Sequence, residues 1–158
     1  MSILLASIHH PLASIIIGLP QMTTKVLLVD DDEIVLDYLS LFIEAAGYDV
    51  VRATNGQDAL TCMRQDFAQI VVLDIGMPGM DGLELCRAIR RQTYSGYVYI
   101  VLHTSRDTDE DFLEGLDAGA DDYLVKGTPK AQIIKRLNAA QRIISYERTL
   151  KISLAQNA

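Results

Sequence analysis

Side chains able to do chemistry follow four short apolar runs of this 158-residue sequence. Residues 30–32 are three aspartates, Asp74 follows the run at 70–73, residues 103–105 are His-Thr-Ser, and Lys126 follows the last run. Adjacent carboxylates repel one another unless a cation offsets their charge, and a hard divalent ion such as Mg²⁺ prefers oxygen ligands. We therefore expect a magnesium-dependent site if these four places converge.

Asp74 is the expected nucleophile of such a site. An ionised carboxylate at the end of the apolar run Ile70–Leu73 is costly unless it works at the rim of the fold. A carboxylate beside a metal can attack phosphorus and become an acyl phosphate. Lys126 can then hold the phosphoryl oxygens, and Thr104 can donate a hydrogen bond to them.

The metal ligands are expected among the same carboxylates. Asp31 and Asp74, with a backbone carbonyl just after Asp74, suit the octahedral oxygen shell of Mg²⁺. Asp32 and Glu33 are interpreted as helix-capping residues instead, because acidic residues are favoured at the N-cap and in the first helical turn.

The elements that position these residues are five apolar runs, each followed by a helical pattern. Continuous apolar runs are typical of parallel strands buried on both faces, and alternation with helices predicts an α/β fold. In such sheets ligands bind beyond the carboxyl ends of the strands, where the candidate residues lie. The predicted strands are Lys25 to Val29, Asp49 to Ala53, Gln69 to Leu73, Tyr97 to Leu102 and Asp121 to Val125.

Five helices are predicted between and after the strands from apolar spacing and capping residues. They comprise one with Ile34, Leu36, Leu39, Phe42 and Ile43 on its apolar face and Gly47 as its C-cap, one from Asn55 to Arg64, one from Gly82 to Arg91, one from Asp109 to Ala118 with apolar Phe112, Leu113 and Leu116, and one from Pro129 onward.

Composition sets the class of protein. With 49% hydrophobic residues the chain predicts one compact domain and a short extension. Cys62 and Cys86 are too few for a disulfide scaffold or zinc cluster, so we interpret them as small core residues in a reducing, cytoplasmic compartment. The net charge of −7 argues against direct binding of nucleic acid, and no apolar run reaches the roughly 18 residues of a membrane helix.

The chain divides into three parts. Residues 1–23 are expected to be a disordered leader or a wrongly assigned start, with Met22 as an alternative start, and Pro11 and Pro20 interrupt them. His9 and His10 have no other ligand nearby and are interpreted as surface residues. Residues 24–145 are expected to form the domain, and residues 146–158 are expected to form a C-terminal helical extension.

Residues 130–158 carry a net charge of +5 within a chain of −7. The basic residues are spaced among apolar ones, which favours a helix over a disordered tail. Two interpretations of its far end stay open, a solvated helix that frays and a surface that docks a partner.

Four motifs in order, each at a strand end, resemble the receiver domain of bacterial two-component response regulators. They are VLLVDDDE at 26–33, VVLDIGMPGMDG at 71–82, HTS at 103–105 and GADDYLVKG at 119–127. The resemblance covers about residues 24–145. It implies a doubly wound, flavodoxin-like sheet of five parallel strands flanked by five helices.

The resemblance also implies a magnesium site and its ligands. Asp74 would be the phospho-acceptor and a metal ligand, Asp31 a direct ligand, Asp30 a ligand through water, and Gly76 a ligand through its backbone carbonyl. The chain would catalyse only its own phosphorylation and dephosphorylation and would not otherwise be an enzyme.

Further roles implied by the resemblance concern the switch and the partners. Lys126 would bind the phosphoryl group, and Thr104 and Tyr123 would respond to it. The donor would be the phosphohistidine of a sensor histidine kinase or phosphotransfer protein, and the reader a downstream output protein or domain. A homodimer through the fourth helix, fifth strand and fifth helix is a further expectation, since the fourth helix is acidic and the fifth basic.

Two positions are unusual for that family. Receivers usually carry proline after the lysine, often with a cis bond, whereas Gly127 follows Lys126 here and the proline comes at Pro129. Glycine allows a looser turn, which affects the expected lifetime and switching of the phosphorylated state. His103 is bulky for its position and is interpreted as a packing residue.

Other classes fit the residues less well. A haloacid-dehalogenase-type phosphatase needs an acid two residues after its nucleophile, where this chain has Gly76. Residues 126–128 reverse the Gly-Lys-Thr order of a P-loop, and the aspartates at 30–32 would repel a pyrophosphate. A receiver detached from a larger regulator stays an alternative.

Overall fold

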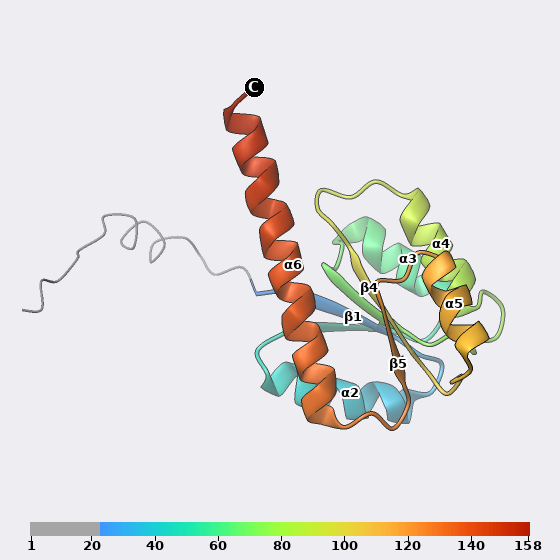
Figure 1. Cartoon of the computed structure of the whole chain (residues 1–158). Helices are drawn as coiled ribbons and strands as arrows, with labels where there is room; N and C mark the ends of the chain where they lie inside the picture. Colours follow the sequence, from blue (N-terminus) through green and yellow to red (C-terminus); the bar gives the residue numbers. More distant parts are fainter. Residues whose placement is uncertain (1–22) are drawn as a thin grey trace, which may run out of the picture.

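A five-stranded parallel sheet lies at the centre of the structure, with helices on both faces (Figure 1). The computed structural model describes residues 23–158, so the expectations for the leader lie outside the described residues, except at Thr23. The strand order is β2-β1-β3-β4-β5. The strands are β1 (Lys25–Val29), β2 (Asp49–Ala53), β3 (Ile70–Leu73), β4 (Tyr99–Thr104) and β5 (Asp122–Val125).

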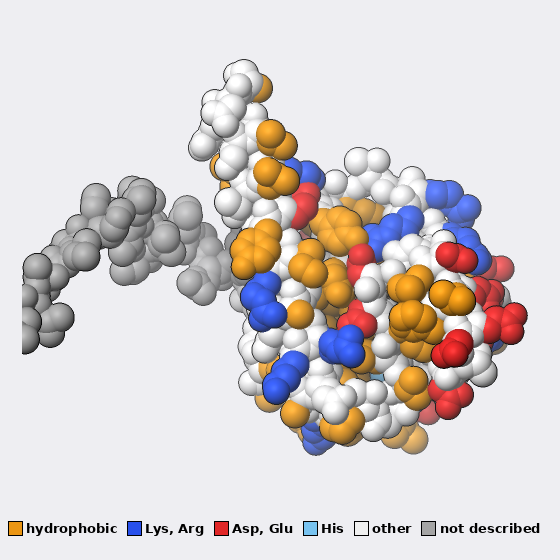
Figure 2. All heavy atoms as spheres, in the orientation of Figure 1, with side chains coloured by type: hydrophobic (Ala, Val, Ile, Leu, Met, Phe, Trp, Pro, Cys, Tyr) orange, Lys and Arg blue, Asp and Glu red, His pale blue; other side chains and the backbone are white. Residues whose placement is uncertain are grey.

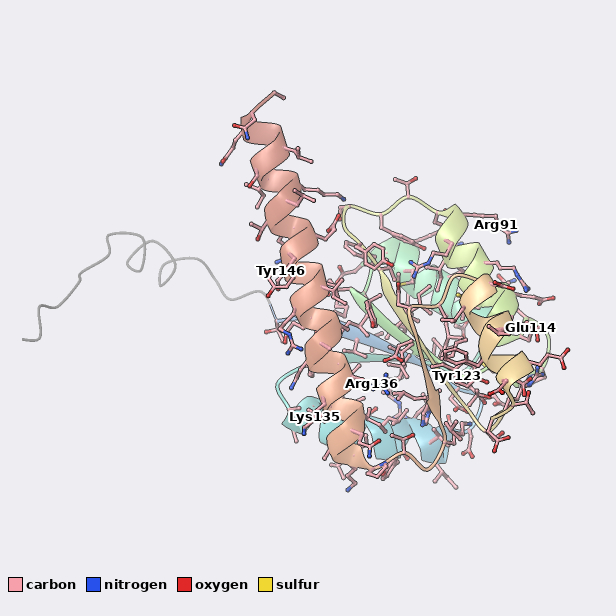
Figure 3. The ribbon with its side chains drawn as sticks, viewed as in Figure 1. Arg91, Glu114, Tyr123, Lys135, Arg136 and Tyr146 are labelled. Atoms are coloured by element: carbon pink, nitrogen blue, oxygen red, sulfur yellow. The ribbon has the colours of Figure 1, made fainter. Side chains whose placement is uncertain are left out.

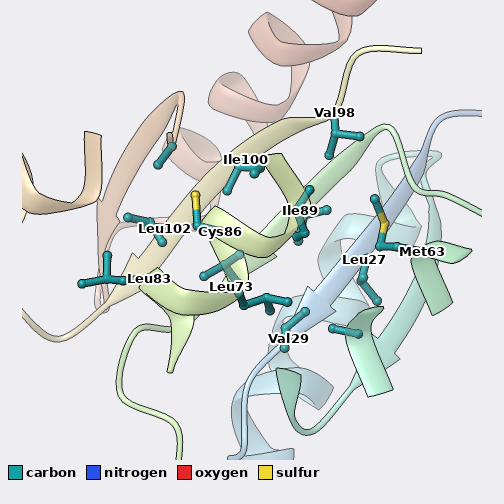
Figure 4. Packing of buried hydrophobic residues seen from close by; sticks show 14 of the residues in the cluster. Leu27, Val29, Met63, Leu73, Leu83, Cys86, Ile89, Val98, Ile100 and Leu102 are labelled. Carbon is teal, nitrogen blue, oxygen red and sulfur yellow. The ribbon is translucent and has the colours of Figure 1, made fainter. Parts of the chain in front are cut away.

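The helices divide between the two faces of the sheet because successive strand residues point to opposite sides. Helices α2 (Glu33–Ala45) and α6 (Lys130–Gln156) pack on the face that carries Val26 and Leu28. Helices α3 (Gly56–Gln65), α4 (Gly82–Arg91) and α5 (Asp109–Asp117) cover the face that carries Leu27 and Val29, part of which Figure 4 shows. The predicted doubly wound α/β fold is therefore confirmed.

Strand boundaries agree with the sequence for β1 and β2, and β3 and β5 each begin one residue later than predicted. The prediction for β4 was wrong at both ends, because the strand runs from Tyr99 to Thr104. His103 and Thr104 are paired with β5, opposite Leu124 and Val125. These two polar residues were predicted to follow the strand, but backbone pairing with β5 extends β4 through them.

Two predicted apolar faces were wrong in detail. Ile34 is 78% exposed, because it lies about 200° around the helix from Leu36, which faces the sheet. In α5 Phe112 and Leu113 are exposed as well. This helix approaches the sheet through Gly115, where an added Cβ would lie 2.5 Å from a methyl group of Leu102. Among the cysteines only Cys86 is fully buried, and Cys62 is half-buried.

Helix α6 is 27 residues long and continuous. Its inward residues Ile133, Leu137, Ala140 and Ile144 are buried against the sheet, and no residue after Ile144 is buried. No helix within residues 23–158 has the length and apolar character needed to cross a membrane.

A partly buried polar network ties three elements together at the amino-terminal edge of β4 and β5. The Arg90 guanidinium donates to the carbonyls of Gly119 (2.8 Å) and Val98 (2.6 Å) and to the Asp121 carboxylate (2.7 Å). The Tyr97 hydroxyl donates to the same carboxylate, and burial together with that contact raises the pKa of Tyr97 to about 12. Arg90 therefore satisfies polar groups that water reaches only in part.

We predict that Arg90→Met destabilises the fold by about 2–3 kcal/mol, because it removes the cation paired with the Asp121 carboxylate and the donor to two carbonyls. Arg91→Met is the matched control, since Arg91 is exposed at the end of the same helix (Figure 3) and should change stability by less than about 0.5 kcal/mol. Urea unfolding of the two variants measures the difference. Equal stability would show that the network contributes nothing.

Candidate functional site

The candidate residues lie together at the carboxyl edge of the sheet, as the sequence predicts. Val29 of β1 is paired with Leu73 of β3, so Asp30 and Asp74, the next residue of each strand, are neighbours. Thr104 ends β4 opposite Val125 of β5, the residue before Lys126.

Three carboxylates converge at this edge. One oxygen from each of Asp30, Asp31 and Asp74 lies within 4.8 Å of the others. Asp30 is 2% exposed and Asp74 is 6% exposed, whereas Asp31 is open to solvent. Burial raises the pKa of Asp30, and the Asp32 N–H and the Lys126 ammonium, which favour the carboxylate, offset only part of that rise.

The Lys126 ammonium group lies between two of these carboxylates. Its Nζ is 2.9 Å from Asp30 Oδ2 and 3.0 Å from Asp74 Oδ2. Burial lowers the pKa of Lys126, but the hydrogen bonds and charges of both aspartates outweigh burial, so the net shift is upward. Lys126 is therefore charged at neutral pH and partly offsets the repulsion between the carboxylates.

The donor set fits a hard divalent cation. Asp31 faces solvent next to the two buried carboxylates, so an ion can reach all three oxygens from outside. Mg²⁺ commonly takes one or two carboxylates and completes its shell with water and phosphate oxygens. Gly76 is exposed in the loop after β3, and its N–H donates to Asp74 Oδ1 at 3.3 Å.

The residues interpreted as caps behave as caps. Asp32 accepts a hydrogen bond from the Ile34 N–H at 2.9 Å and is the N-cap of α2, and Glu33 begins the helix. The Asp32 N–H donates to Asp30 Oδ1, also at 2.9 Å. Asp32 thus supports the site through its backbone N–H. The residue type at position 32 gives no sign of this contact, because any residue except proline has an N–H.

Thr104 and Tyr123 are linked through the loop after β4. Thr104 is buried, its Oγ1 accepts from the Arg106 N–H at 3.4 Å, and its carbonyl accepts from the Lys126 N–H at 2.8 Å. The Tyr123 hydroxyl donates to the Arg106 carbonyl at 2.9 Å. Arg106 was not a candidate, because it takes part through backbone atoms that any residue would supply.

The Tyr123 ring rests on α5. It meets the Phe112 ring edge-to-face, with 5.7 Å between the ring centroids, and lies against the backbone of Gly115. Burial, together with nearby acidic residues, raises the pKa of Tyr123. A change in the position of this ring must therefore disturb the outer surface of α5.

His103 packs in the interior, as the sequence suggests. It is 5% exposed, and its Nδ1 has no hydrogen-bond partner among the described residues. Burial and the nearby Lys126 charge lower the pKa of His103 to about 4, so the ring is neutral at pH 7.

The β5–α6 loop turns through Gly127, whose φ is +97°. Proline fixes φ near −65° and cannot adopt this conformation. The Thr128 N–H donates to the Val125 carbonyl at 3.1 Å and closes the turn around Lys126. Gly127 therefore forms a turn that a proline at this position could not form.

Comparisons with known proteins agree with this geometry. Residues 26–138 match the response regulator receiver domain family. The chemotaxis protein CheY4 of Vibrio cholerae is 30% identical, with a TM-score of 0.71 over 75% of this chain and 98% of that one.

Two further solved structures are similar to the chain. The BeF3-activated N-terminal receiver domain of RstA from Klebsiella pneumoniae is 36% identical, with a TM-score of 0.70 over 75% of this chain and 99% of that one. A putative response regulator from Chloroflexus aurantiacus is 30% identical, with a TM-score of 0.71 over 75% and 97% of the two chains. With its CheY-like strand order and its acidic pocket of Asp30, Asp31 and Asp74, the chain belongs to the response regulator receiver domain family of two-component signalling.

Proposed function

We propose that Asp74 accepts a phosphoryl group, in a Mg²⁺-dependent reaction, from the phosphohistidine of a histidine kinase or phosphotransfer protein in the cytoplasm. Receiver domains are not conventional enzymes, and the proposed reaction modifies the chain itself. The observation that supports it best is the position of Asp74, which has oxygens of two other carboxylates within 4.8 Å and the Lys126 ammonium 3.0 Å away.

The proposed step is a nucleophilic displacement at phosphorus. A carboxylate oxygen of Asp74 forms a bond to phosphorus, the bond from phosphorus to the donor imidazole nitrogen breaks, and its electron pair stays on that nitrogen. Lys126 then binds a phosphoryl oxygen while it keeps its contact with Asp30. Thr104 donates a hydrogen bond to another phosphoryl oxygen.

The same proposal assigns the metal ligands. Asp31, Asp74 and the carbonyl of Gly76 would hold Mg²⁺ directly, and Asp30 would hold it through water. When bound, Mg²⁺ neutralises negative charge on the phosphoryl oxygens. Asp30 is suited to the indirect role because its two oxygens already accept from the Asp32 N–H and Lys126.

We predict that acetyl phosphate with Mg²⁺ adds one phosphoryl group to the parent protein and that Asp74→Asn abolishes the addition, because the amide is not a nucleophile. Asp107→Asn, an exposed aspartate beyond β4, is the control and should react normally. Intact-mass measurement after acid quenching decides. An undiminished phosphoryl mass in Asp74→Asn would defeat the assignment.

We predict that Asp31→Asn weakens Mg²⁺ binding by about tenfold or more, because it removes one charged ligand. It should also raise metal-free stability slightly, since one repulsive charge is lost. Asp32→Asn is the matched control, because asparagine keeps the N-cap and Asp32 is outside the triad. Calorimetric titration of both variants with Mg²⁺ tests this, and equal affinities would contradict the metal assignment.

We further propose that phosphorylation draws Thr104 toward the phosphoryl group and moves Tyr123. The Thr104–Arg106–Tyr123 contacts support this coupling, since Arg106 accepts from the Tyr123 hydroxyl and donates to Thr104. The surface affected would be α5, β5 and α6, which an output protein or a second copy of the chain would bind.

The charges on this surface favour a second copy. Figure 2 shows apolar side chains on α5 with acidic residues around them, and basic side chains along α6. Lys135 and Tyr146 lie on α6 and Glu114 on α5 in Figure 3. Arg136 is already paired with Asp122 at 2.9 Å, so part of this attraction acts within one molecule. Ile144 is buried in its own domain, whereas Leu150 is 61% exposed, so only the outer residues are free to bind.

We predict that phosphorylation increases dimerisation and that Thr104→Ala keeps phosphorylation but loses this increase. Leu150→Glu should abolish the dimer, because burying a charge at an apolar contact is costly. Ile34→Glu is the control, since Ile34 is 78% exposed and lies on α2, away from the proposed surface. Sedimentation velocity with and without phosphorylation measures the outcome. A monomer under every condition would exclude the dimer, and a full response in Thr104→Ala would exclude Thr104 from the switch.

A further inference from the structure

A hollow of about 270 Å³ opens between α6 and residues 92–98, which join α4 to β4. Figure 1 shows this connection beside the C-terminal half of α6, at the end of the sheet where β4 begins. Nothing in the proposed phosphoryl chemistry uses this hollow. Its lining residues are Phe67, Gln69, Ser95, Gly96, Tyr97, Ile144, Glu147, Arg148 and Lys151.

One part of the lining is aromatic and held in place by its neighbours. The Phe67 ring stacks on Tyr94, with 5.7 Å between the centroids and 26° between the planes. The backbone passes close to the same ring at Gly96, where an added Cβ would lie 3.4 Å from Phe67 Cζ. Tyr97 is fixed by its hydrogen bond to Asp121. The aromatic surface is therefore present before any ligand binds.

The opposite part of the lining holds two basic side chains, Arg148 and Lys151, and the Glu147 carboxylate. Arg148 and Lys151 are three residues apart on α6 and so lie on one side of the helix. Lys151 is paired with Glu147 at 2.9 Å, and Glu147 also accepts from the Tyr97 N–H at 3.4 Å. Arg148 forms no ion pair with any of residues 23–158. One guanidinium group at this hollow is thus free to bind an anion.

We propose that this hollow binds a small aromatic anion. The ring of the ligand lies against Phe67 and Tyr97, and its carboxylate or phosphate binds the Arg148 guanidinium, which presents paired donors suited to such groups. The volume limits the ligand to one or two rings, below the usual size range of drug-sized pockets. This inference does not depend on phosphorylation of Asp74.

The ligand would contact both α6 and the α4–β4 connection. Ile144, in the floor of the hollow, is the last buried residue of α6. A bound anion would therefore add a contact at the place where the helix leaves the domain.

The test is an NMR titration of the full chain, labelled with ¹⁵N, with 1-naphthoate in Mg²⁺-free buffer. We expect saturable shifts at the amides of Ser95, Gly96 and Tyr97, and binding of the neutral 1-naphthalenemethanol at least about tenfold weaker. Arg148→Gln should weaken 1-naphthoate binding by a similar factor. Arg142→Gln, on the same helix but outside the lining, is the matched control and should not.

Four results would overturn the proposal. Absence of saturable shifts at these amides would show that the hollow binds no such ligand. Equal affinity for 1-naphthoate and the alcohol, or an unchanged affinity in Arg148→Gln, would show that the guanidinium does not select anions. Shifts confined to residues around Asp30 and Lys126 would place the probe at the acidic edge instead.

Discussion

The contact of one ammonium group with two carboxylates is the constraint on which the acidic edge depends. Asp30 and Asp74 are nearly inaccessible to water, and carboxylates at this separation repel by something on the order of 3 kcal/mol at the effective dielectric of a protein. Lys126 is the only cation within 4 Å of either among residues 23–158. The repulsion at this edge is therefore reduced by Lys126, which directly follows the edge strand β5.

The order of the strands explains why a lysine fills this place. β1 and β3 are neighbours, which puts Asp30 beside Asp74, but β4 separates β3 from β5. The group at the end of β5 must cross the end of β4 to reach the aspartates, and the long flexible stem of lysine allows this. The Lys126 N–H bonded to the Thr104 carbonyl fixes the base of that stem. The same hydrogen bond keeps Thr104, an uncharged residue, next to the acidic edge.

The sequence predicts most of this because apolar runs and strand-end polar residues are local signals. The strands, the helices and the convergence of Asp30, Asp31, Asp74 and Lys126 all followed from them. What it missed depends on neighbours. The extension of β4 to Thr104 needs β5 as partner, the exposure of Phe112 follows from the close approach at Gly115, and the Arg106 link uses backbone atoms.

The length of α6 has a mechanical consequence. The helix begins four residues after Lys126, follows the positive-φ turn at Gly127, and at 1.5 Å per residue its 27 residues extend about 40 Å. If it tilts as a rigid rod by about 5°, its far end moves about 3.5 Å relative to its start, by the same geometry. The last buried side chain, Ile144, lies just past the midpoint, so the outer half carries no buried side chain and still contacts the domain through the Glu147 hydrogen bond with the Tyr97 N–H. A small tilt at the start of α6, next to the acidic edge, thus becomes a movement about as long as a side chain at the C-terminal end of the helix.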